Sequence, residues 1–115
     1  MHELSIAVSL AEAAEAELHR QGDAHLLAVH LKLGELSGVT RDALLFSFEI
    51  VCQNTPLEGS RLVIEDIPVL IDCEPCGAPR SVVSLQKFCC AICGAPSGKL
   101  LQGREIELSA LEIQT

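Results

Sequence analysis

Two short cysteine motifs limit what this chain can fold into more than any other feature. Residues 73–79 read C-E-P-C-G-A-P and residues 90–96 read C-A-I-C-G-A-P, so one seven-residue pattern occurs twice. In a C-x-x-C-G turn the two sulfurs converge on one side of the backbone, and the glycine can take a positive φ and turn its amide toward a thiolate. Two such pairs supply the four thiolates that close a tetrahedral structural zinc site. The sequence therefore predicts a zinc site at Cys73, Cys76, Cys90 and Cys93.

Two further cysteines lie outside the repeat. Cys89 is adjacent to Cys90 and could compete for the metal, but only Cys90 and Cys93 reproduce the frame of the first motif. We therefore interpret Cys89 as a spare thiol. Cys52 lies in an apolar helical pattern, where a cysteine most often behaves as a small buried hydrophobic residue.

Composition indicates a small folded chain with an aliphatic core. Its 115 residues, 49% of them hydrophobic, suffice for one ordinary domain or two very small ones. Trp and Tyr are absent and there are only three Phe. Six cysteines in a reducing cytosol indicate metal or redox use and argue against disulfides. A thioredoxin-like redox site is disfavoured, because it needs one C-x-x-C that opens a helix, whereas both motifs here run into Gly-Ala-Pro.

The charge balance disfavours nucleic acid as a partner. Sixteen acidic residues against eight basic ones give a formal net charge of −8, which repels phosphate backbones and suits a cation or a basic protein surface. No apolar run approaches the roughly 18 residues that a membrane-spanning helix needs, and the start lacks a secretory signal pattern. We therefore expect a cytoplasmic protein with no membrane partner.

Two segments have helical periodicity. Residues 4–21 contain neither Gly nor Pro and precede a stop at Gly22, and their apolar stripe is Ile6, Leu10, Ala14 and Leu18. Residues 41–53 follow Thr40, which is expected to be the N-cap of the helix. The apolar stripe of this second helix is Leu44, Phe48, Val51 and Cys52.

Three segments are predicted to be strands. Residues 27–33 alternate, with Leu27, Val29, Leu31 and Leu33 inward and Ala28, His30 and Lys32 on the polar phase. Residues 61–67 form the second strand, with Pro68 at its exit. Residues 105–113 form the third, with a bulge near Ala110 and with Ile106, Leu108 and Ala110 inward.

These elements predict an α/β (α+β) body, in which two helices pack on a small three-stranded sheet and a zinc-ribbon-like four-cysteine module is inserted. Two strands alone make a poor sheet, so the third strand is expected to return and complete it. The body then comprises residues 1–69 and 100–115, and the zinc-binding module comprises residues 70–99.

The first three residues, Met1-His2-Glu3, offer a second set of metal ligands. A free amine, a backbone amide nitrogen and the imidazole of His2 can close fused chelate rings around one ion, and such planar nitrogen ligation suits Ni(II) or Cu(II). The alternative is an ordinary N-terminus, since any protein can begin with Met-His. The remaining histidines, His19, His25 and His30, are expected to be surface residues, with His25 in a turn.

Taken together, the motifs resemble the HypA/HybF family of hydrogenase nickel-incorporation proteins. The likeness rests on the Met-His-Glu start, the strand that ends at residues 32–35, the turn at residues 55–59 and the paired C-x-x-C knuckles, and it covers essentially the whole chain. It implies a non-enzymatic metallochaperone that delivers nickel to the large-subunit precursor of a [NiFe] hydrogenase and works with the GTPase HypB, as a monomer or weak homodimer.

The resemblance also implies residue roles. Nickel, the transient cargo, would be held by Met1, His2 and Glu3, with His2 the indispensable side chain, and structural zinc by the four cysteines of the two knuckles. Some relatives place a carboxylate near the start of the second helix, where this chain has Thr40, and Asp42 only two residues later. A nickel ligand from that region is therefore not carried over.

Two other functions fit the residues. A zinc-ribbon adaptor would only bridge proteins and would have an unexceptional N-terminus. A small rubredoxin-like electron carrier would hold iron in the same four sulfurs, but the knuckles lack the aromatic residues that would shield such a site. No nucleophile, base and orienting group can be placed together from the sequence, so catalysis is not expected.

Overall fold

The computed structural model describes residues 2–22 and 24–114 of the chain. The chain order is α1 (Glu3–Arg20), β1 (His25–Gly34), α2 (Arg41–Cys52), β2 (Arg61–Ile67), β3 (Leu70–Cys73), β4 (Ala78–Ser84), β5 (Lys87–Cys90), β6 (Leu100–Gln102) and β7 (Ile106–Gln114). These elements form two compact units. The helical unit comprises Met1–Lys32, Val39–Glu65 and Glu107–Thr115, and the cysteine unit comprises Leu33–Gly38 and Asp66–Ile106.

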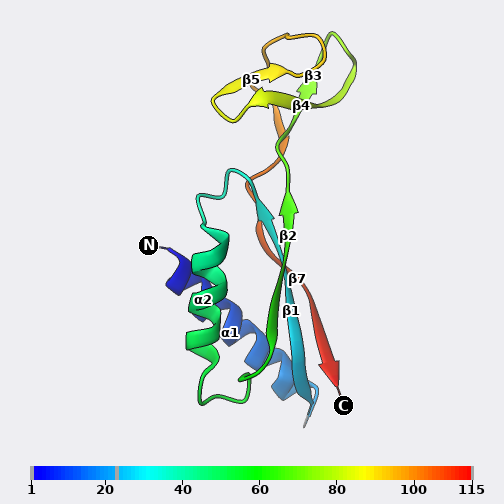
Figure 1. The fold of residues 1–115 in the computed structure, drawn as a ribbon. Helices are drawn as coiled ribbons and strands as arrows, with labels where there is room; N and C mark the ends of the chain where they lie inside the picture. Colours follow the sequence, from blue (N-terminus) through cyan, green and yellow to red (C-terminus); the bar gives the residue numbers. More distant parts are fainter. Residues whose placement is uncertain (1, 23, 115) are drawn as a thin grey trace. The chain divides into compact units, whose positions relative to one another are not determined.

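The helical unit is built on a three-stranded sheet in the order β2-β1-β7. Figure 1 shows α1 and α2 on the same side of this sheet, and the two helices pack against each other. The last strand of the chain thus returns to complete the sheet that β1 and β2 begin. The predicted class, two helices on a three-stranded sheet with an inserted four-cysteine module, is confirmed.

Both helices bury the stripes that their apolar periodicity predicts, with small differences. Along α1 the buried side chains are Glu3, Ala7, Leu10, Ala11, Ala14 and Leu18, and along α2 they are Leu44, Phe48 and Cys52. Ile6 and Val51 are only half-buried. Thr40 occupies the N-cap position of α2 with an extended backbone, but its side chain makes no capping hydrogen bond. The prediction that Thr40 is the N-cap of this helix is confirmed.

The predicted burial of β1 is wrong at its start. Leu27 is 39% exposed, whereas Leu26 and Ala28 are buried. From Val29 onward the predicted phase holds, since Val29, Leu31 and Leu33 are all buried. Ala28 and Val29 are adjacent, and both are fully buried. Ala28 lies on the same face of the strand as His30 and Lys32, but its side chain is small and β1 is the middle strand of the sheet, so it is covered. The strand begins at His25, which was expected in a turn.

The predicted inward face of β7 is also wrong. Ile106 and Leu108 are 42% and 38% exposed, Ala110 is exposed, and the half-buried residues are Leu111 and Ile113. The physical reason is the position of β7 at the edge of the sheet, where little of the strand is covered. Alternation along a strand shows which residues share a face, but not which face is covered.

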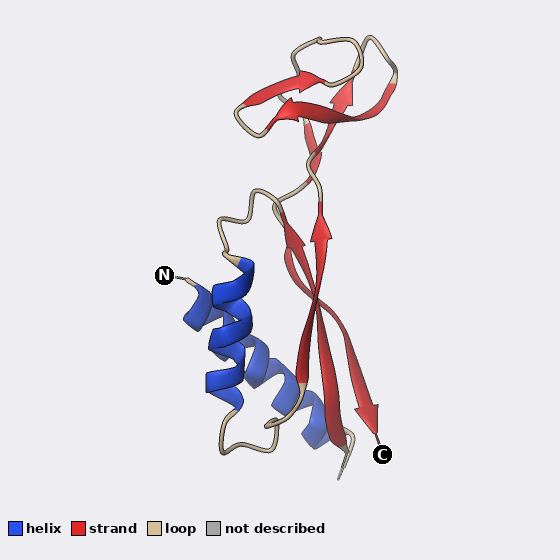
Figure 2. Ribbon diagram, in the orientation of Figure 1, coloured by secondary structure: helices blue, strands red, loops and turns tan. Residues whose placement is uncertain are grey.

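The cysteine unit contains a four-stranded sheet in the order β5-β4-β3-β6 (Figure 2). Strands β3 and β4 pair antiparallel, with Cys73 opposite Ala78, so the residues between them form the turn of a hairpin. Strand β4 pairs with β5, with Val82 opposite Cys90. These strands were not predicted individually, because three of them have only three or four residues, too few to show a period.

Two glycines let backbone segments of the cysteine unit approach closely. The Gly34 amide donates to the Glu105 carbonyl at 2.8 Å, and the Leu36 amide donates to the Gly103 carbonyl at 2.7 Å. A Cβ atom at Gly34 would lie 2.2 Å from the oxygen of Gly103. A Cβ atom at Gly103, whose φ is +128°, would lie 2.9 Å from Cγ2 of Val69. Neither position has room for a side chain.

Candidate metal centre

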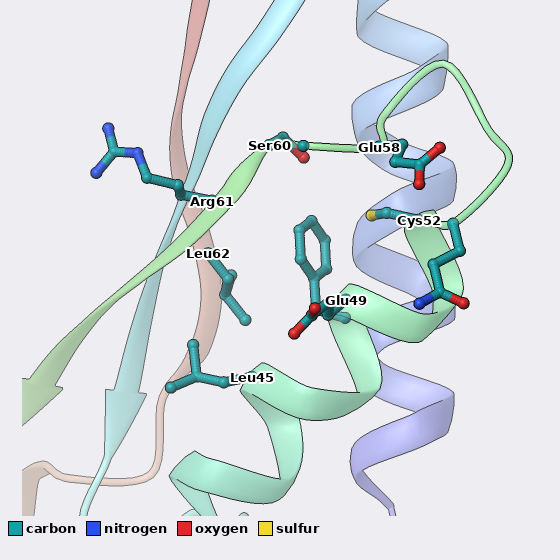
Figure 3. Close-up of a pocket in the computed structure, with 10 residues that line it drawn as sticks. Leu45, Glu49, Cys52, Glu58, Ser60, Arg61 and Leu62 are labelled. Carbon is teal, nitrogen blue, oxygen red and sulfur yellow. The ribbon is translucent and has the colours of Figure 1, made fainter.

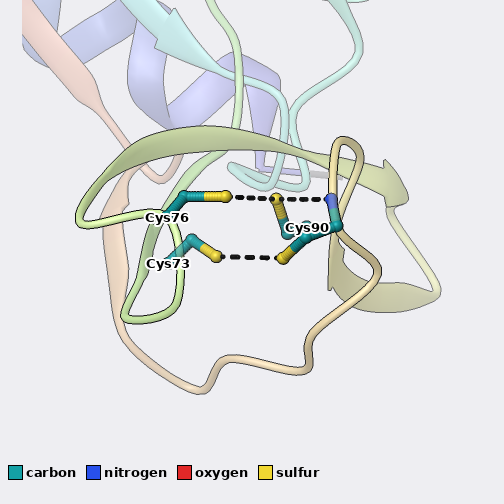
Figure 4. A group of neighbouring side chains, drawn as sticks. Cys73, Cys76 and Cys90 are labelled. Carbon is teal, nitrogen blue, oxygen red and sulfur yellow. Dashed lines mark hydrogen bonds between the residues drawn. The ribbon is translucent and has the colours of Figure 1, made fainter.

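The four predicted zinc ligands come together in the cysteine unit. The Sγ atoms of Cys73, Cys76, Cys90 and Cys93 all lie within 4.8 Å of one another. Sγ of Cys73 is 3.5 Å from Sγ of Cys93, and Sγ of Cys76 is 3.9 Å from Sγ of Cys90 (Figure 4). A tetrahedron with metal–sulfur bonds of about 2.3 Å has edges of about 3.8 Å, so the spacing fits one tetrahedrally coordinated ion.

The repeated motif produces the same turn twice. Gly77 and Gly94 have φ values of +65° and +79°, as predicted for the glycine after each second cysteine. Their amides, however, donate to the carbonyls of Cys73 and Cys90, each at 2.8 Å. The expectation that these amides turn toward a thiolate is wrong, since they close the turns through the backbone.

Two other backbone amides donate hydrogen bonds to the sulfur of Cys90. The backbone N–H groups of Ile92 and Cys93 each donate to Sγ of Cys90 at 3.4 Å. The Cys93 amide, aided by the Ile92 amide and opposed by burial, lowers the pKa of Cys90 to about 6. The Cys76 amide lowers the pKa of Cys73, but burial and the neighbouring thiols outweigh it and raise that pKa to about 12. Of these two buried thiols, Cys90 is therefore the more readily ionised.

The sheet holds the two knuckles in register. Cys73 ends β3 and Cys90 ends β5, and both are fully buried. The Ala91 amide donates to the Ser81 carbonyl at 3.0 Å, which ties the second knuckle to β4. The Ser97 hydroxyl donates to the carbonyl of Asp72 at 2.7 Å, which ties the segment after the second knuckle to the strand before the first.

One basic residue of the cysteine unit has a buried nitrogen. The Nε atom of Arg80 on β4 is buried and has no hydrogen-bond partner in the described chain. Four thiolates around a divalent ion carry a net charge of −2, so a cation beside them is stabilised. The donor set of four grouped cysteine sulfurs fits a zinc site.

The N-terminal candidates are placed differently. His2 is exposed and precedes α1, while Glu3 begins the helix and is only 7% exposed. The Thr40 amide donates to Oε2 of Glu3 at 2.9 Å, so the carboxylate joins the starts of both helices. Asp42 lies exposed in the first turn of α2. Met1 lies outside the described residues.

Comparison with known proteins decides the family. The model of a family described as a hydrogenase/urease nickel-incorporation metallochaperone, HypA, matches residues 1–113. The chain belongs to the HypA family. The hydrogenase maturation factor HypA of Roseiflexus sp. (strain RS-1) is 48% identical over 114 residues, which are 99% of this chain and 93% of the relative. HypA of Chloroflexus aurantiacus (strain J-10-fl) is 44% identical over 112 residues, 97% of this chain and 98% of that one.

Solved structures of HypA proteins share the fold. The solution structure of the Ni metallochaperone HypA from Helicobacter pylori has a TM-score of 0.65 and 26% identity, covering 98% of this chain and 97% of that one. A second solution structure, of a HypA protein, has a TM-score of 0.72 and 26% identity, covering 99% and 97%. The predicted family resemblance is thereby confirmed.

The two remaining cysteines of this HypA-family chain lie apart from the cluster. Cys89 is half-buried and its backbone pairs with that of Pro96, and it is not among the four grouped sulfurs. Cys52 lines a cavity of about 530 Å³ in the helical unit, beside Phe48, Glu49 and Glu58 (Figure 3). Burial raises the pKa of the Cys52 thiol. The prediction that Cys52 is a small buried residue is confirmed.

The structure adds contacts that sequence reasoning missed. His19 and His25 are exposed as expected, but Nε2 of His30 lies 2.5 Å from Oε1 of Glu112. The bond between Thr40 and Glu3 spans 37 positions, and no sequence pattern links the two.

Proposed function

We propose that this HypA-family chain is a nickel metallochaperone that delivers Ni(II) to the large-subunit precursor of a [NiFe] hydrogenase. The observation that carries the proposal is the match of the nickel-incorporation family model over residues 1–113, which includes the Met-His-Glu start. The family's role in nickel incorporation implies protein partners. The partners proposed here are the GTPase HypB and the hydrogenase precursor, in the cytoplasm.

In this proposal nickel binds at Met1, His2 and Glu3. The exposed imidazole of His2, a backbone nitrogen and the terminal amine can form fused chelate rings, the nitrogen ligation that Ni(II) favours. Glu3 supports the site because its carboxylate is bonded to the Thr40 amide and ties the chain's start to α2. A site anchored on one side and exposed on the other can release its cargo to a partner by ligand exchange.

Zinc has the opposite role in the proposal. The cluster of Cys73, Cys76, Cys90 and Cys93 would hold it, and its charge would stabilise the four thiolates and cross-link the two knuckles. Cys73 and Cys90 are fully buried and Cys76 is half-buried, whereas Cys93 is exposed, so the cysteine unit would cover most but not all of the ion. A closed four-thiolate shell suits a permanent ion, and the exposed side chain of His2 suits a transient one.

Among the described residues, no helix combines the length and apolar content needed to cross a bilayer. Both helices are instead amphipathic, with one buried stripe each.

Replacing His2 tests the nickel proposal. In equilibrium dialysis of zinc-loaded protein against Ni(II), His2→Ala is expected to abolish stoichiometric nickel binding, because it removes the imidazole ligand. His19→Ala is the matched control, since His19 is an exposed histidine in the last turn of α1, the helix that His2 precedes. Residues added ahead of Met1 should weaken binding by displacing the terminal amine.

Stoichiometric nickel binding by His2→Ala would refute the carrier function. The chain would then be better described as a zinc-ribbon adaptor between proteins. Equal loss in His2→Ala and His19→Ala would also count against the assignment, because it would show a nonspecific effect of removing a surface imidazole.

A further inference from the structure

A cavity of about 530 Å³ lies between α2 and β2 in the helical unit (Figure 3). None of the predicted metal ligands lines it. Its apolar lining comes from Leu45, Phe48 and Leu62, and Phe48 is only 2% exposed. Pockets of about 300–1,000 Å³ are typical of sites that enclose a bound group. The volume is therefore sufficient for a long side chain of a second molecule.

Two carboxylates accompany this apolar lining. Glu49 on α2 and Glu58 in the loop before β2 both line the cavity, and both are exposed. The Asn54 amide donates to Oε1 of Glu58 at 3.2 Å, which orients that carboxylate. In the part of the chain that the structure describes, no basic side chain forms an ion pair with Glu49 or Glu58.

The arginine of the cavity lining does not neutralise these carboxylates. Figure 3 shows the side chain of Leu62 pointing toward α2, and that of Arg61 extending away from Cys52 and Glu58. This is expected, because successive side chains of a strand point to opposite faces. The charge that faces the cavity is therefore negative.

Two exposed hydrophobic residues adjoin the cavity. Phe46 and Ile50 on α2 are 65% and 44% exposed. Residues three and four positions apart are neighbours on a helix surface, so Phe46 and Ile50 lie beside Glu49. Exposed apolar side chains grouped beside a cavity are typical of a surface that another protein covers. A small cation in the cavity would leave both of them uncovered.

Charge decides which macromolecule suits this surface. A partner that covered Glu49 and Glu58 without supplying a cation would bury unpaired carboxylates, which is strongly unfavourable. A second copy of the chain is disfavoured, because a twofold contact would bring the same carboxylates together and each copy carries a formal charge of −8. The occupant must therefore be a different protein with basic side chains among apolar ones.

We infer that this α2 surface, formed by Phe46, Ile50 and the cavity with Glu49 and Glu58, binds a segment of a partner protein that inserts a lysine or arginine into the cavity. The aliphatic stem of that side chain contacts the apolar lining while its charged head meets the carboxylates. Apolar residues of the same segment cover Phe46 and Ile50. The inference rests on the proposed function for the identity of the proteins that test it.

Binding of the two partners proposed above, the GTPase and the hydrogenase precursor, tests the inference. Isothermal titration calorimetry gives the Kd of each for the zinc-loaded parent and its variants. Phe46→Ala should weaken binding of at least one partner about tenfold or more, because truncation of an aromatic residue at the centre of an interface typically has that effect. The double variant Glu49→Gln with Glu58→Gln removes charge with little change of shape, and should weaken the same complex about tenfold.

Two control variants separate this surface from the rest of the chain. Glu12→Gln removes an exposed carboxylate of α1, and Val83→Ala truncates a side chain of β4 that is 55% exposed. Each should bind within about twofold of the parent. Raising the salt concentration from about 0.05 M to about 0.5 M should weaken the parent complex more than that of the double glutamine variant, because salt screens the charges that the variant lacks. A merely structural effect would leave this salt dependence unchanged.

Parent-like binding of both partners by Phe46→Ala and by the double variant would overturn this inference, as would equal losses in the controls. A loss in Phe46→Ala alone would overturn the basic anchor. Self-association of the parent that Phe46→Ala abolishes in sedimentation would assign the surface to a second copy and overturn the inference.

Nickel dialysis separates this inference from the proposed function. The surface variants should bind nickel as the parent does, because His2 and Glu3 are unchanged. A parent that binds nickel through His2, with partner binding unaffected by the surface variants, overturns this inference alone. A parent that binds neither partner overturns the proposed partners and this inference together.

Discussion

Removal of zinc should unfold the cysteine unit and leave the helical unit folded. Outside its cysteines, the buried hydrophobic residues of the cysteine unit are Leu33, Val69 and Ile71. Full burial of such a side chain contributes about 1.5–3 kcal/mol, so the three together contribute about 5–9 kcal/mol. Structural zinc contributes about 10–16 kcal/mol in small zinc domains. The ion is thus the larger stabilising term, and the unit should not stay folded without it.

The helical unit has a core of its own. Its buried residues include Leu10, Leu18, Leu44 and Phe48, and none of the four clustered cysteines belongs to it. Chelation should therefore leave its stability almost unchanged.

Hydrogen exchange read by mass spectrometry is the appropriate assay, because it reports each segment separately. Zinc-loaded protein should show protection in α1, α2 and β3–β5. After chelation and removal of the zinc, peptides from residues 69–102 should exchange as fast as an unfolded chain, while those from α1 and α2 keep their protection. Cys90→Ser should show the same loss without a chelator. Cys89→Ser is the matched control and should remain protected, because its sulfur lies outside the cluster.

Two results would refute this reasoning. Persistent protection of β3–β5 in protein shown to contain no zinc would mean that apolar packing and hydrogen bonds alone suffice. Equal loss of protection in α1 and α2 would mean that the ion stabilises the whole chain.

Three further outcomes are expected. Phe48→Ala should lower the free energy of unfolding of the helical unit by about 3–5 kcal/mol, because the Phe48 side chain is only 2% exposed. Phe46→Ala should change this free energy by less than about 0.5 kcal/mol, because Phe46 is 65% exposed. Urea unfolding followed by circular dichroism of the helices compares the two variants. Gly34→Ala should destabilise the cysteine unit by about 3 kcal/mol, since the added Cβ would lie 2.2 Å from a backbone oxygen. Gly38→Ala should destabilise it by about 1–2 kcal/mol, because the added Cβ meets no atom but the backbone φ is +77°. Hydrogen exchange of zinc-loaded protein measures both, and equal effects would contradict the steric argument. Nickel uptake should fall as the pH is lowered from about 7.5 to about 5.5, because protons compete for imidazole ligands in this window; a flat dialysis titration would argue against His2 ligation.

The repeat C-x-x-C-G-A-P determined the cysteine cluster before any fold was known. Short motifs encode local geometry directly. This local geometry predicts the four ligands, the positive φ of Gly77 and Gly94, and the exclusion of Cys89 from the cluster. The stripes of α1 and α2 were predictable for the same reason, since helical periodicity relates residues three and four positions apart. Because two strands alone make a poor sheet, the alternating segment near the end of the sequence was expected to complete it, and β7 does so.

The tertiary structure decided what depends on distant neighbours. The elements that pack over each face of the sheet decide whether Leu26 or Leu27 is buried and how much of β7 is covered. Strand alternation does not show which face those elements cover. The Thr40 amide bonds to the Glu3 carboxylate, and the Ser97 hydroxyl bonds to the Asp72 carbonyl. Both bonds join residues that no local pattern connects. Local motifs specify ligands because chelation is short-ranged, whereas burial and charge compensation arise only when remote segments of the chain meet.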